Sequence, residues 1–501
     1  MGARLTPLAA LLAVVVTAAP AARGEGRPEY GGDVVGSLLG EPSTLDPVHA
    51  RTHAEVTLVS LIFDTLYRFD DKGRVRPHLA SALPRISADR LTAHIPLVSG
   101  VTFHDGGPLS AADVAASLQR LAGDARAGWL LAPVRGVRAG EGEVIIDLRR
   151  DTPELAQLLA APQTSITPRG AAPAGDRAIG TGPFALRVID RRARRVVLGA
   201  FDGHFAGRPY LDTVELDWFQ DPDEEARRYE RGLTHMSLRG AVAFSGHQPK
   251  FATDEVEGPA TLLVFVGFGR AHKPVENSRD FRHALSLSVA RTGFRGVGTG
   301  ERVVPAVYPD AVDIGGEATD RADRSERPAE ARAALARAAR RVPQLAGAAS
   351  KLDLEVLIDK SRPDDREVAE KVVAALYRLG VRSHIVALAT PAFAAHTQRG
   401  ACDLYIGQLA TPVPVPALAT AAAFAVGGDD WTRRMLTKAR LRPDGARVWF
   451  DQRLPILPLF HRAVRVHFRH DLRGVGFDGT TRLGLADVFA RGAATLSAGT
   501  R

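Results

Sequence analysis

The sequence predicts an α/β fold, and three stretches of the chain carry this prediction. Residues 352–388 show the pattern of a strand, a helix and a second strand, which is typical of a βαβ unit with parallel strands. Residues 261–268 (TLLVFVGF) form a continuous apolar run, as in a strand buried on both faces. Residues 101–121 combine a short strand, a glycine-rich turn and a helix, and Ser110 and Asp113 have the spacing of a capping box at the helix start.

The composition is that of a globular protein with more than one domain. A chain of 501 residues suggests roughly two to four domains. Hydrophobic residues make up 45% and charged residues 24%, which is ordinary for a soluble globular body. The net charge is +8, but the arginines are scattered and acidic residues lie between them. We therefore expect no nucleic-acid interface.

The first 22 residues have the pattern of a secretory signal peptide. Arg4 is followed by an apolar run at residues 8–16 and by Ala19-Pro20-Ala21, a small-residue cleavage pattern. The apolar run is shorter than the ~20 residues that a membrane-spanning helix needs. No cysteine follows it that could carry a lipid. We expect export to the periplasm as a soluble protein without a lipid anchor.

Cys402 is the only cysteine, so no disulfide can form within the chain. It lies in ACDLYIGQ (401–408), which has the pattern of a buried strand. Nothing nearby in the sequence would lower the pKa of the thiol, as a nucleophile requires. We therefore predict an inert thiol in the core.

The first part of the chain predicts short strands around two helices. A strand over residues 33–39 precedes a turn rich in Pro, Ser and Asp, and apolar residues at helical spacing predict one helix over residues 52–69. A second helix begins at Ser110 and runs to Leu121. Further strands are expected at residues 91–97, 101–103, 142–148, 179–201 (two strands and a turn) and 210–219.

From residue 221 onward, helices become more frequent. They are expected at residues 221–232, where Gly232 ends the helix, at 279–290 and at 328–341. The last of these is rich in Ala and Arg, which predicts a solvent-exposed face. Residues 411–428 are rich in Pro and then in Ala, and their pattern assigns no element.

His104 and Asp105 are adjacent in HDGGPL (104–109), and either a catalytic pair or a structural turn could explain them. A catalytic base and the carboxylate that orients it usually meet through the fold rather than as chain neighbours. The glycines and the proline here supply a tight turn. The sequence also contains no nucleophile elbow, zinc-protease helix or phosphate-binding loop. We predict a structural turn, no catalytic residue and no enzymatic activity.

His49 and His53 are four residues apart, which would place both on one face of a helix, with Glu55 nearby. His49 follows Leu45-Asp46-Pro47, however, and stands before the expected helix start. We therefore expect surface or cleft-edge histidines, with no metal site and no cofactor. A metal or metal-chelate carrier that uses His49 and His53 is kept as an alternative.

Seven motifs follow one another in a characteristic order between Gly31 and Ala490. They are EPSTLDP (41–47), LYR (66–68), VTFHDGGPLSAADV (101–114), GTGPF (180–184), GHFAGRPYLDTVEL (203–216), FRHALSLSVAR (281–291) and LPILPLFH (454–461). Together they resemble the family 5 extracellular solute-binding proteins of ABC importers, the group that contains oligopeptide-, dipeptide- and nickel-binding proteins. The third motif is the most specific, because it matches the family pattern V-x-F-H-D-G-x-P-L-x-A-x-D-V.

This resemblance implies a two-lobed periplasmic-binding-protein fold of type II, with the ligand cleft between the lobes. Lobe I would comprise residues 30–46, 177–259 and 465–501, and lobe II residues 260–464. An extra subdomain, residues 47–176, would be inserted in lobe I. Such lobes close on a ligand by hinge motion, and the closed form is the one that a permease recognises.

One stretch departs from the pattern of the peptide binders in this family. After the strand that carries Asp403-Leu404, they usually have Gly-Trp and then an Asp-rich loop, which anchor the ligand and its amino group. Here Gln408 stands where the Trp is expected, and no Asp follows through residue 425. A free ammonium in a dry cleft would lack its counter-charge. We therefore expect a solute other than a standard peptide with a free N-terminus, or a loss of transport function.

Five residues are candidates for ligand contacts. We expect Glu41 and Thr44 after the first strand, His53 at the helix start, and Gln408 and Thr411 on lobe II to line the cleft and hydrogen-bond the solute. A capping or surface role is the alternative for each of them.

The predicted function is the exported solute-binding component of an ABC import system for a peptide, a peptide-like or another small solute. Its partners would be that solute and an ABC permease of the inner membrane, and the chain itself would be a monomer. A sensor module uncoupled from transport, a metal-chelate carrier and an enzyme of unrecognised type are the alternatives.

Overall fold

The structure is a computed structural model of the chain. It describes residues 28–491 apart from 175–176, 220, 239–250, 296, 298–302, 310–325, 347–351, 363, 412, 414, 429–430, 439–441 and 481. The predicted signal peptide, residues 1–22, lies outside the described residues.

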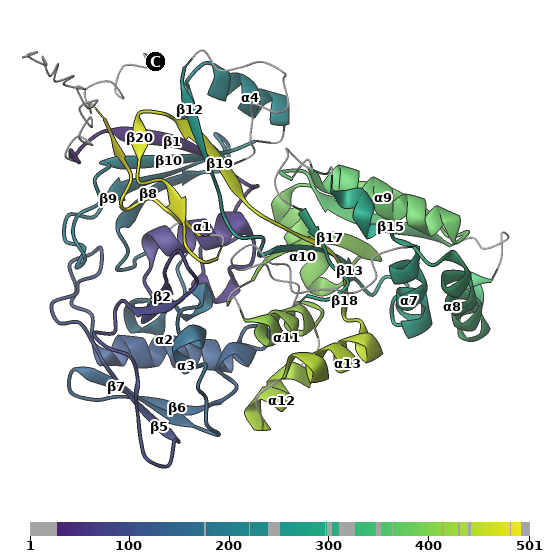
Figure 1. The fold of residues 1–501 in the computed structure, drawn as a ribbon, viewed down its shortest axis with the longest axis horizontal. Coiled ribbons are helices and arrows are strands. Elements are labelled where there is room, and N and C mark those ends of the chain that lie inside the picture. Colours follow the sequence, from purple (N-terminus) through teal and green to yellow (C-terminus); the bar gives the residue numbers. More distant parts are fainter. Residues whose placement is uncertain are drawn as a thin grey trace, which may run out of the picture.

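A seven-stranded mixed sheet forms the centre of the first lobe, which lies at the upper left of Figure 1. β1 pairs in parallel with β10 and β11, and the other neighbours are antiparallel. In sheet order the strands are β12 (Thr253–Glu257), β19 (Arg465–Arg469), β11 (Met236–Ser237), β1 (Asp33–Leu38), β10 (Thr213–Trp218), β9 (Arg195–Ala200) and β8 (Phe184–Asp190). A buried apolar cluster joins this sheet to α1 (His53–Ile62).

A six-stranded mixed sheet forms the second lobe, at the right of Figure 1. In sheet order its strands are β14 (Val303–Pro305), β18 (Ile456–Arg462), β13 (Leu262–Phe268), β17 (Leu404–Ala410), β15 (Asp353–Asp359) and β16 (Arg382–Leu388). β15, α9 (Asp364–Arg378) and β16 form the predicted βαβ unit with parallel strands. The helices α7 (Arg279–Ser288), α8 (Pro328–Arg341) and α10 (Thr390–Arg399) also belong to this lobe.

A smaller four-stranded sheet lies below the first lobe in Figure 1 and packs against α2 (Ala111–Gly123). Its strands, in order, are β4 (Arg85–Ile86), β5 (Thr92–Pro96), β7 (Glu143–Leu148) and β6 (Val134–Ala139). The Ser110 side chain accepts from Asp113 N–H, and the Asp113 side chain accepts from Ser110 N–H, so the predicted capping box is confirmed.

The remaining elements are short or lie at the edges of these sheets. They are η1 (Pro47–His49), β2 (Tyr67–Phe69), β3 (Val75–Pro77), η2 (Gly128–Leu131), α3 (Leu155–Leu158), η3 (Pro162–Thr164), η4 (Pro168–Gly170), α4 (Pro222–Glu230), α6 (Lys273–Glu276), η5 (Arg291–Phe294), η6 (Pro343–Leu345), α11 (Pro416–Val426), α12 (Trp431–Lys438), α13 (Pro443–Arg453), β20 (Leu472–Arg473), β21 (Gly476–Phe477), β22 (Leu483–Gly484) and β23 (Phe489–Ala490).

The helix predicted over residues 52–69 is shorter in the structure. α1 ends at Ile62, because Phe63 adopts an extended conformation with φ −125° and ψ 150°. Tyr67–Phe69 then forms β2, which pairs with β3 across a turn in which Gly73 has a φ of +71°. The apolar residues that predicted one long helix are therefore divided between a helix and the strand that follows it.

Two helices show what the sequence pattern left out. α8 has the predicted solvent-exposed face, but on its other side Ala331, Ala334 and Ala338 are buried in the core of the second lobe. Alanines at spacings of three and four give the helix a narrow apolar stripe, and it packs beside α7. In the unassigned stretch 411–428, residues 416–426 form the helix α11, most of which is buried.

The two large sheets are connected by two short chain crossings. The chain passes from β12 to β13 through residues 258–261 and returns from β18 to β19 through residues 463–464. Gly258 N–H donates to Val464 O at 2.8 Å, so the crossings lie side by side. We propose that the boundaries between lobe I and lobe II lie in these segments.

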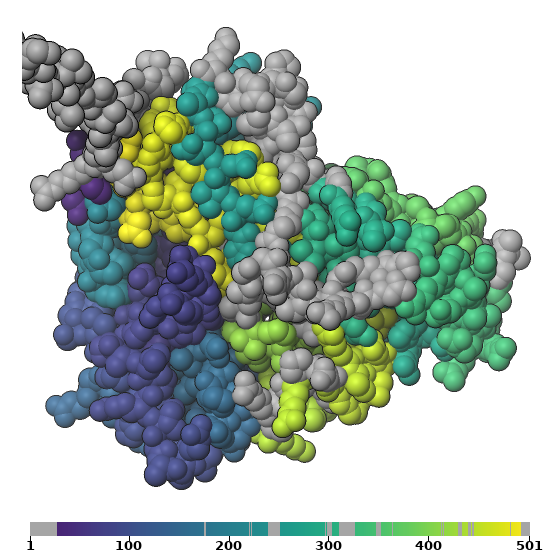
Figure 2. All heavy atoms as spheres, viewed as in Figure 1, coloured from purple at the N-terminus to yellow at the C-terminus, as the bar shows by residue number. Residues whose placement is uncertain are grey.

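The lobes also touch at a distance from the crossings. In Figure 2 the yellow-green segment around α12 and α13 lies against the blue atoms of the inserted subdomain. Arg433 Nη2 donates to Ala122 O at 2.8 Å, and Arg150 Nε donates to Leu436 O at 3.0 Å. A single apolar cluster continues from α2 into α11 and α13. This arrangement is a closed one, in which lobe II meets the subdomain.

Candidate functional site

A cavity of about 670 Å³ lies where the two lobes and the inserted subdomain meet. Its first wall comes from the segment after β1, the start of α1 and the segment after α2. Its second wall comes from β13, β15, β17 and α10. Sites for small molecules in proteins are typically clefts of roughly 300–1,000 Å³, so this volume suits a small solute.

The first wall begins at a sharp turn at the end of β1. Gly40 has a φ of +103°, and a Cβ there would lie 2.9 Å from Arg362 Cγ on lobe II. The turn presents Glu41, whose backbone N–H donates to Ser361 Oγ at 2.9 Å across the cleft. Glu41 Oε1 accepts from Arg191 Nη1 at 3.0 Å. The lobes therefore touch at this edge of the cavity.

Glu55 holds the first wall together. Its carboxylate accepts from the backbone N–H groups of Ser43, Arg51 and Thr52 at 3.2, 2.9 and 3.0 Å, and also from the Ser43 hydroxyl. Thr52 Oγ1 accepts in return from Glu55 N–H, which completes a capping box at the start of α1. The carboxylate of Glu55 is therefore saturated by its own neighbours.

Basic groups occupy the same wall. His49 lies between Asp46 and Asp124, at 3.2 Å and 3.1 Å, and the hydrogen bond to Asp46 together with that to Asp124 raises the pKa of the imidazole. Arg51 and Arg126 also line the cavity. Arg126 Nη2 donates to Gln398 O of α10 at 2.9 Å, which is a second contact across the cleft.

Lobe II contributes a polar cluster around Gln408. Gln408 Nε2 donates to Asp365 Oδ1 at 3.0 Å. Burial raises the pKa of Asp365 to about 6, although Arg362 opposes this. Arg362 Nε lies 3.2 Å from Asp365 Oδ2, and its guanidinium stacks over the Phe393 ring at 5.1 Å. Arg362 is therefore already paired.

Aromatic rings line the floor of the cavity on β13 and β17. Phe265 stands opposite Gly407 and Tyr405 opposite Gly267 in the antiparallel register of these strands. A Cβ at Gly267 would lie 2.0 Å from Tyr405 Cζ, and one at Gly407 would lie 2.3 Å from Phe265 Cζ. The two rings meet edge to face, with centroids 6.0 Å apart. The absence of a side chain at each glycine thus makes room for an aromatic ring.

Three of the five predicted ligand contacts line this cavity and two do not. Glu41, Thr44 and Gln408 are lining residues. His53 is fully buried within α1, and its side chain is not part of the lining. Thr411 is also buried, and its hydroxyl donates to Thr261 O at 2.8 Å beside the crossing between the lobes.

Sequence analysis did not single out several residues that line the cavity. Arg51, Arg126 and Arg362 were part of a scattered arginine content, and nothing in their spacing distinguished them. The α10 wall includes Phe393 and Gln398, in a helix that no sequence prediction covered. Arg51 directly precedes Thr52, the N-cap of α1. This position at the start of a helix beside the expected cleft is the one sequence signal that could have identified it.

The two histidines proposed for a metal-carrier alternative do not form one ligand set. His49 faces Asp46 and Asp124, whereas His53 is buried. Within the part of the chain that the structure describes, one group of three or more His, Cys, Asp or Glu side chains has metal-like spacing, and it lies outside the cavity: His272, Glu276 and Asp403. His272 Nδ1 is 2.7 Å from Asp403 Oδ1, so these groups already satisfy one another in part.

The HDGGPL turn and the single thiol have structural roles. A His104 ring nitrogen lies 2.9 Å from Gly182 O, and Asp105 Oδ1 accepts from Gly107 N–H at 3.0 Å, so the two side chains serve backbone groups rather than each other. Burial lowers the pKa of His104. Cys402 is a buried free cysteine, and burial raises the pKa of its thiol to about 12. Such a thiol is a poor nucleophile.

Over the described residues, none of the helices combines the length and the apolar character that crossing a membrane would require.

Comparison with known families and proteins gives a consistent result. The family model described as bacterial extracellular solute-binding proteins, family 5 Middle, matches residues 74–430, more than half of the chain. Among curated proteins, the uncharacterized protein YhjP of Bacillus subtilis is 35% identical over 187 residues, which are 36% of this chain and 31% of YhjP. The oligopeptide-binding protein AppA of Bacillus subtilis is 27% identical over 287 residues, 54% of this chain and 52% of AppA. The matches thus span about half or less of these relatives.

Solved structures resemble the whole described fold. The structure of AppA from Bacillus subtilis in complex with a nonapeptide has a TM-score of 0.77 at 17% identity, over 93% of this chain and 100% of AppA. NikA from Staphylococcus aureus in complex with Ni(L-His)2 has a TM-score of 0.76 at 16% identity, over 92% of this chain and 100% of NikA. The fold is therefore the two-lobed α/β fold of the periplasmic binding proteins.

Proposed function

This chain belongs to the bacterial extracellular solute-binding proteins of family 5, and from this premise we propose that it is the exported solute-binding component of an ABC import system. It captures a small solute, a peptide, a peptide-like compound or another molecule of similar size, between its two lobes. It then presents the closed, loaded form to a permease in the inner membrane. No bond of the solute is made or broken.

The observation that carries this proposal is the cavity of about 670 Å³ with walls from both lobes. A ligand there touches the segment after β1 on one side and β17 and α10 on the other. Because the ligand contacts both lobes only when they are together, it stabilises the closed form by its differential affinity for that form. Glu41, Thr44 and Gln408 are proposed as solute contacts, whereas His53 and Thr411 are left out of the binding surface.

The chain crossings support a hinge motion. Both large sheets have their own buried apolar clusters, and residues 258–261 and 463–464 connect them. Short adjacent crossings between rigid bodies absorb the backbone rotation that domain closure needs. The predicted signal peptide supports export to the periplasm as a soluble monomer, where the lobes can meet a permease.

Identification of the captured solute tests the proposal. The protein is expressed with its leader, purified under native conditions and denatured, and the released compounds are identified by mass spectrometry. The expected result is one class of small solute in about molar equivalence. Adding this solute to refolded protein should raise Tm and reduce the radius of gyration in X-ray scattering, because it stabilises the closed form. A bound compound that is converted to product, or scattering that never responds to the solute, would contradict the proposal.

A further inference from the structure

An arginine without a partner faces the cavity. Among the residues that the structure describes, the Arg51 guanidinium has no hydrogen-bond or ion-pair partner, although its backbone is held: Arg51 O accepts from Ala410 N–H of lobe II at 2.7 Å. Arg126 lines the same cavity and makes one side-chain contact, to Gln398 O. Neither guanidinium is paired with a carboxylate of the described chain. The wall therefore carries two positive charges with free donors.

The acidic groups of the cavity, in contrast, are already occupied. Glu55 accepts from its neighbours, and Glu41 is paired with Arg191. Asp124 accepts from Arg126 N–H and Ala127 N–H and from His49.

Asp359, on the opposite wall, accepts from Ser361 N–H and from the hydroxyls of Ser361 and Thr390. Each of these carboxylates therefore has its own donors, whereas the donors of the Arg51 guanidinium have no acceptor among the described residues and Arg126 has one.

The position of Arg51 is costly without a ligand. Burial lowers the pKa of Arg51 and the neighbouring charge of Arg126 lowers it further, although the charges of Glu55, Tyr405 and Asp124 oppose this. A buried charge is expensive unless it is paired and hydrogen-bonded. The Tyr405 phenol is close enough to feel both guanidiniums, and it lines the same cavity. Arg51, Arg126 and Tyr405 thus bring three donor groups to the lining of one cavity.

We propose that Arg51 and Arg126, with the Tyr405 hydroxyl as a further donor, form a subsite for a carboxylate of the solute. A guanidinium offers two parallel N–H donors that match the two oxygens of a carboxylate. This inference rests on the proposed function and names the chemical class of its solute. The protein then recognises its solute by the acidic end, which fits the absence of an Asp-rich loop after Gln408.

A derivatised peptide mixture tests the subsite. Refolded, ligand-free protein is incubated with casein hydrolysate that is untreated, N-acetylated or methyl-esterified, and with citrate and inorganic phosphate as anions that are not peptides. Bound compounds are recovered by gel filtration and quantified by mass spectrometry. Acetylated peptides should bind as well as untreated ones, and esterified peptides at least about tenfold less, because a charge-assisted hydrogen-bond pair is lost. Selective capture of citrate would assign the carboxylate to a free acid and also supports the subsite, whereas selective capture of phosphate would overturn its assignment to a carboxylate.

Variants separate the subsite from a structural role. Arg51→Met and Arg126→Met should each reduce capture at least about tenfold, whereas Arg85→Met should not, because Arg85 is exposed in the subdomain and pairs with Glu143. Ligand-free Arg51→Met should keep or raise Tm, since an uncompensated charge is removed. Equal capture of esterified and untreated peptides, or unchanged capture by Arg51→Met, would overturn the inference.

The stability measurement also decides the case in which the wild-type protein captures none of the probes. That outcome would count against the proposed function. If the Tm of ligand-free Arg51→Met were then lower than that of the wild type, Arg51 would have a structural role. The proposed carboxylate subsite would be rejected. A solute that binds without regard to its carboxylate would remove the subsite and leave the proposed function standing.

Discussion

Glu276 shows how burial changes the chemistry of a single residue. It is fully buried at the end of α6, where Oε1 accepts from His272 N–H at 2.6 Å. Burial raises the pKa of Glu276 from its usual 4.5 to about 7. The folded protein therefore binds a proton that the unfolded chain has released over this interval. Its contribution to stability is present below pH 4.5 and is lost as the pH rises toward 7.

The variant Glu276→Gln should remove this pH dependence. Glutamine stays neutral at every pH, so the Tm of the variant relative to the wild type should rise between about pH 5 and about pH 8. Differential scanning calorimetry at a series of pH values measures the difference. Glu330→Gln, at an exposed position in the first turn of α8, is the control and should show a flat difference. A flat difference for Glu276→Gln as well would contradict the assigned protonation.

Glu55 provides a test of the cavity wall. The residue is 3% exposed, and its carboxylate accepts hydrogen bonds from Ser43, Arg51 and Thr52. In Glu55→Gln an amide NH₂ must face at least one of these donors, so the free energy of unfolding should fall by about 1–3 kcal/mol. Urea unfolding followed by tryptophan fluorescence measures this loss. A stability equal to that of Glu330→Gln would show that the bonds contribute nothing.

At the scale of elements, the pairing of β13 with β17 determines the cavity floor. Phe265 and Tyr405 each lie over a glycine of the neighbouring strand. An aromatic ring over a strand glycine covers backbone that would otherwise be bare. The two glycines are therefore packing positions, although both strands are otherwise rich in large apolar residues.

Gly407→Ala should disturb this floor. The new methyl group would lie 2.3 Å from Phe265 Cζ, so the ring must move, at a cost of about 1–3 kcal/mol in the free energy of unfolding. Gly445→Ala in the first turn of α13 meets no atom within 4 Å and should be neutral or stabilising by up to about 1 kcal/mol. Denaturant unfolding of both variants checks the contrast. Equal effects at the two positions would show that the rings do not need the glycines.

Elements with a strong local pattern could be predicted from the sequence, and those defined by packing could not. The Ser110–Asp113 capping box and the parallel strands 353–359 and 382–388 have the predicted form. The helix expected over residues 52–69 ends early, because hydrophobic spacing does not reveal that Phe63 turns into extended chain. The alanines of α8 are buried because α7 lies beside them, a contact between segments that no local pattern encodes.

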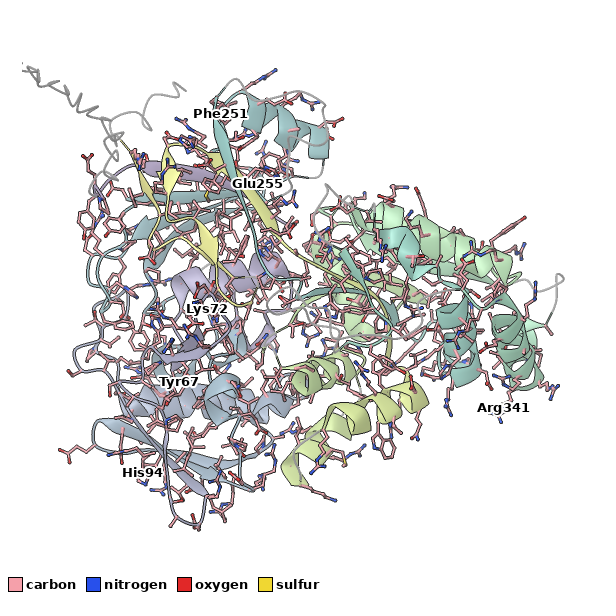
Figure 3. The ribbon with its side chains drawn as sticks, in the orientation of Figure 1. Tyr67, Lys72, His94, Phe251, Glu255 and Arg341 are labelled. Atoms are coloured by element: carbon pink, nitrogen blue, oxygen red, sulfur yellow. The ribbon has the colours of Figure 1, made fainter. Side chains whose placement is uncertain are left out.

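At the scale of the whole molecule, the proposed function gives contacts across the cleft a role in the balance between open and closed forms. Figure 3 shows how far the molecule extends, from His94 in the subdomain to Arg341 at the end of α8. Arg433 of lobe II joins the two bodies, since Nη2 donates to Ala122 O at 2.8 Å and Nη1 to Asp124 O at 3.3 Å. These bonds exist only while the lobes are together.

Arg433→Met should shift the ligand-free protein toward the open form. The radius of gyration from X-ray scattering should increase, and the apparent Kd for the captured solute should rise several-fold, because fewer molecules are ready to bind. Arg340→Met, at an exposed position in α8, is the matched control and should change neither quantity. If Arg433→Met matched this control, the bonds to Ala122 and Asp124 would have no part in closure.

The cavity itself could be predicted only in part. Sequence analysis named Glu41, Thr44 and Gln408, which line the cavity: Glu41 and Thr44 follow β1, and Gln408 lies within β17. Arg51 and Arg126 are 75 positions apart in the numbering, and α10 was not foreseen, so nothing in the sequence placed them together. Their meeting depends on how the subdomain sits against both lobes, which is a property of the tertiary structure.

The Arg51 guanidinium, which has no partner among the described residues, has a consequence for the amount of ATP used per imported solute. Under the proposed function, this cation would lose part of its water shell when lobe II covers an empty cleft and gain no anion in exchange, which would disfavour closure of the vacant molecule. A solute with a carboxylate would supply the missing anion and allow the two lobes to close. The permease would then rarely bind a closed protein without solute. Few cycles of ATP hydrolysis would therefore occur without transport.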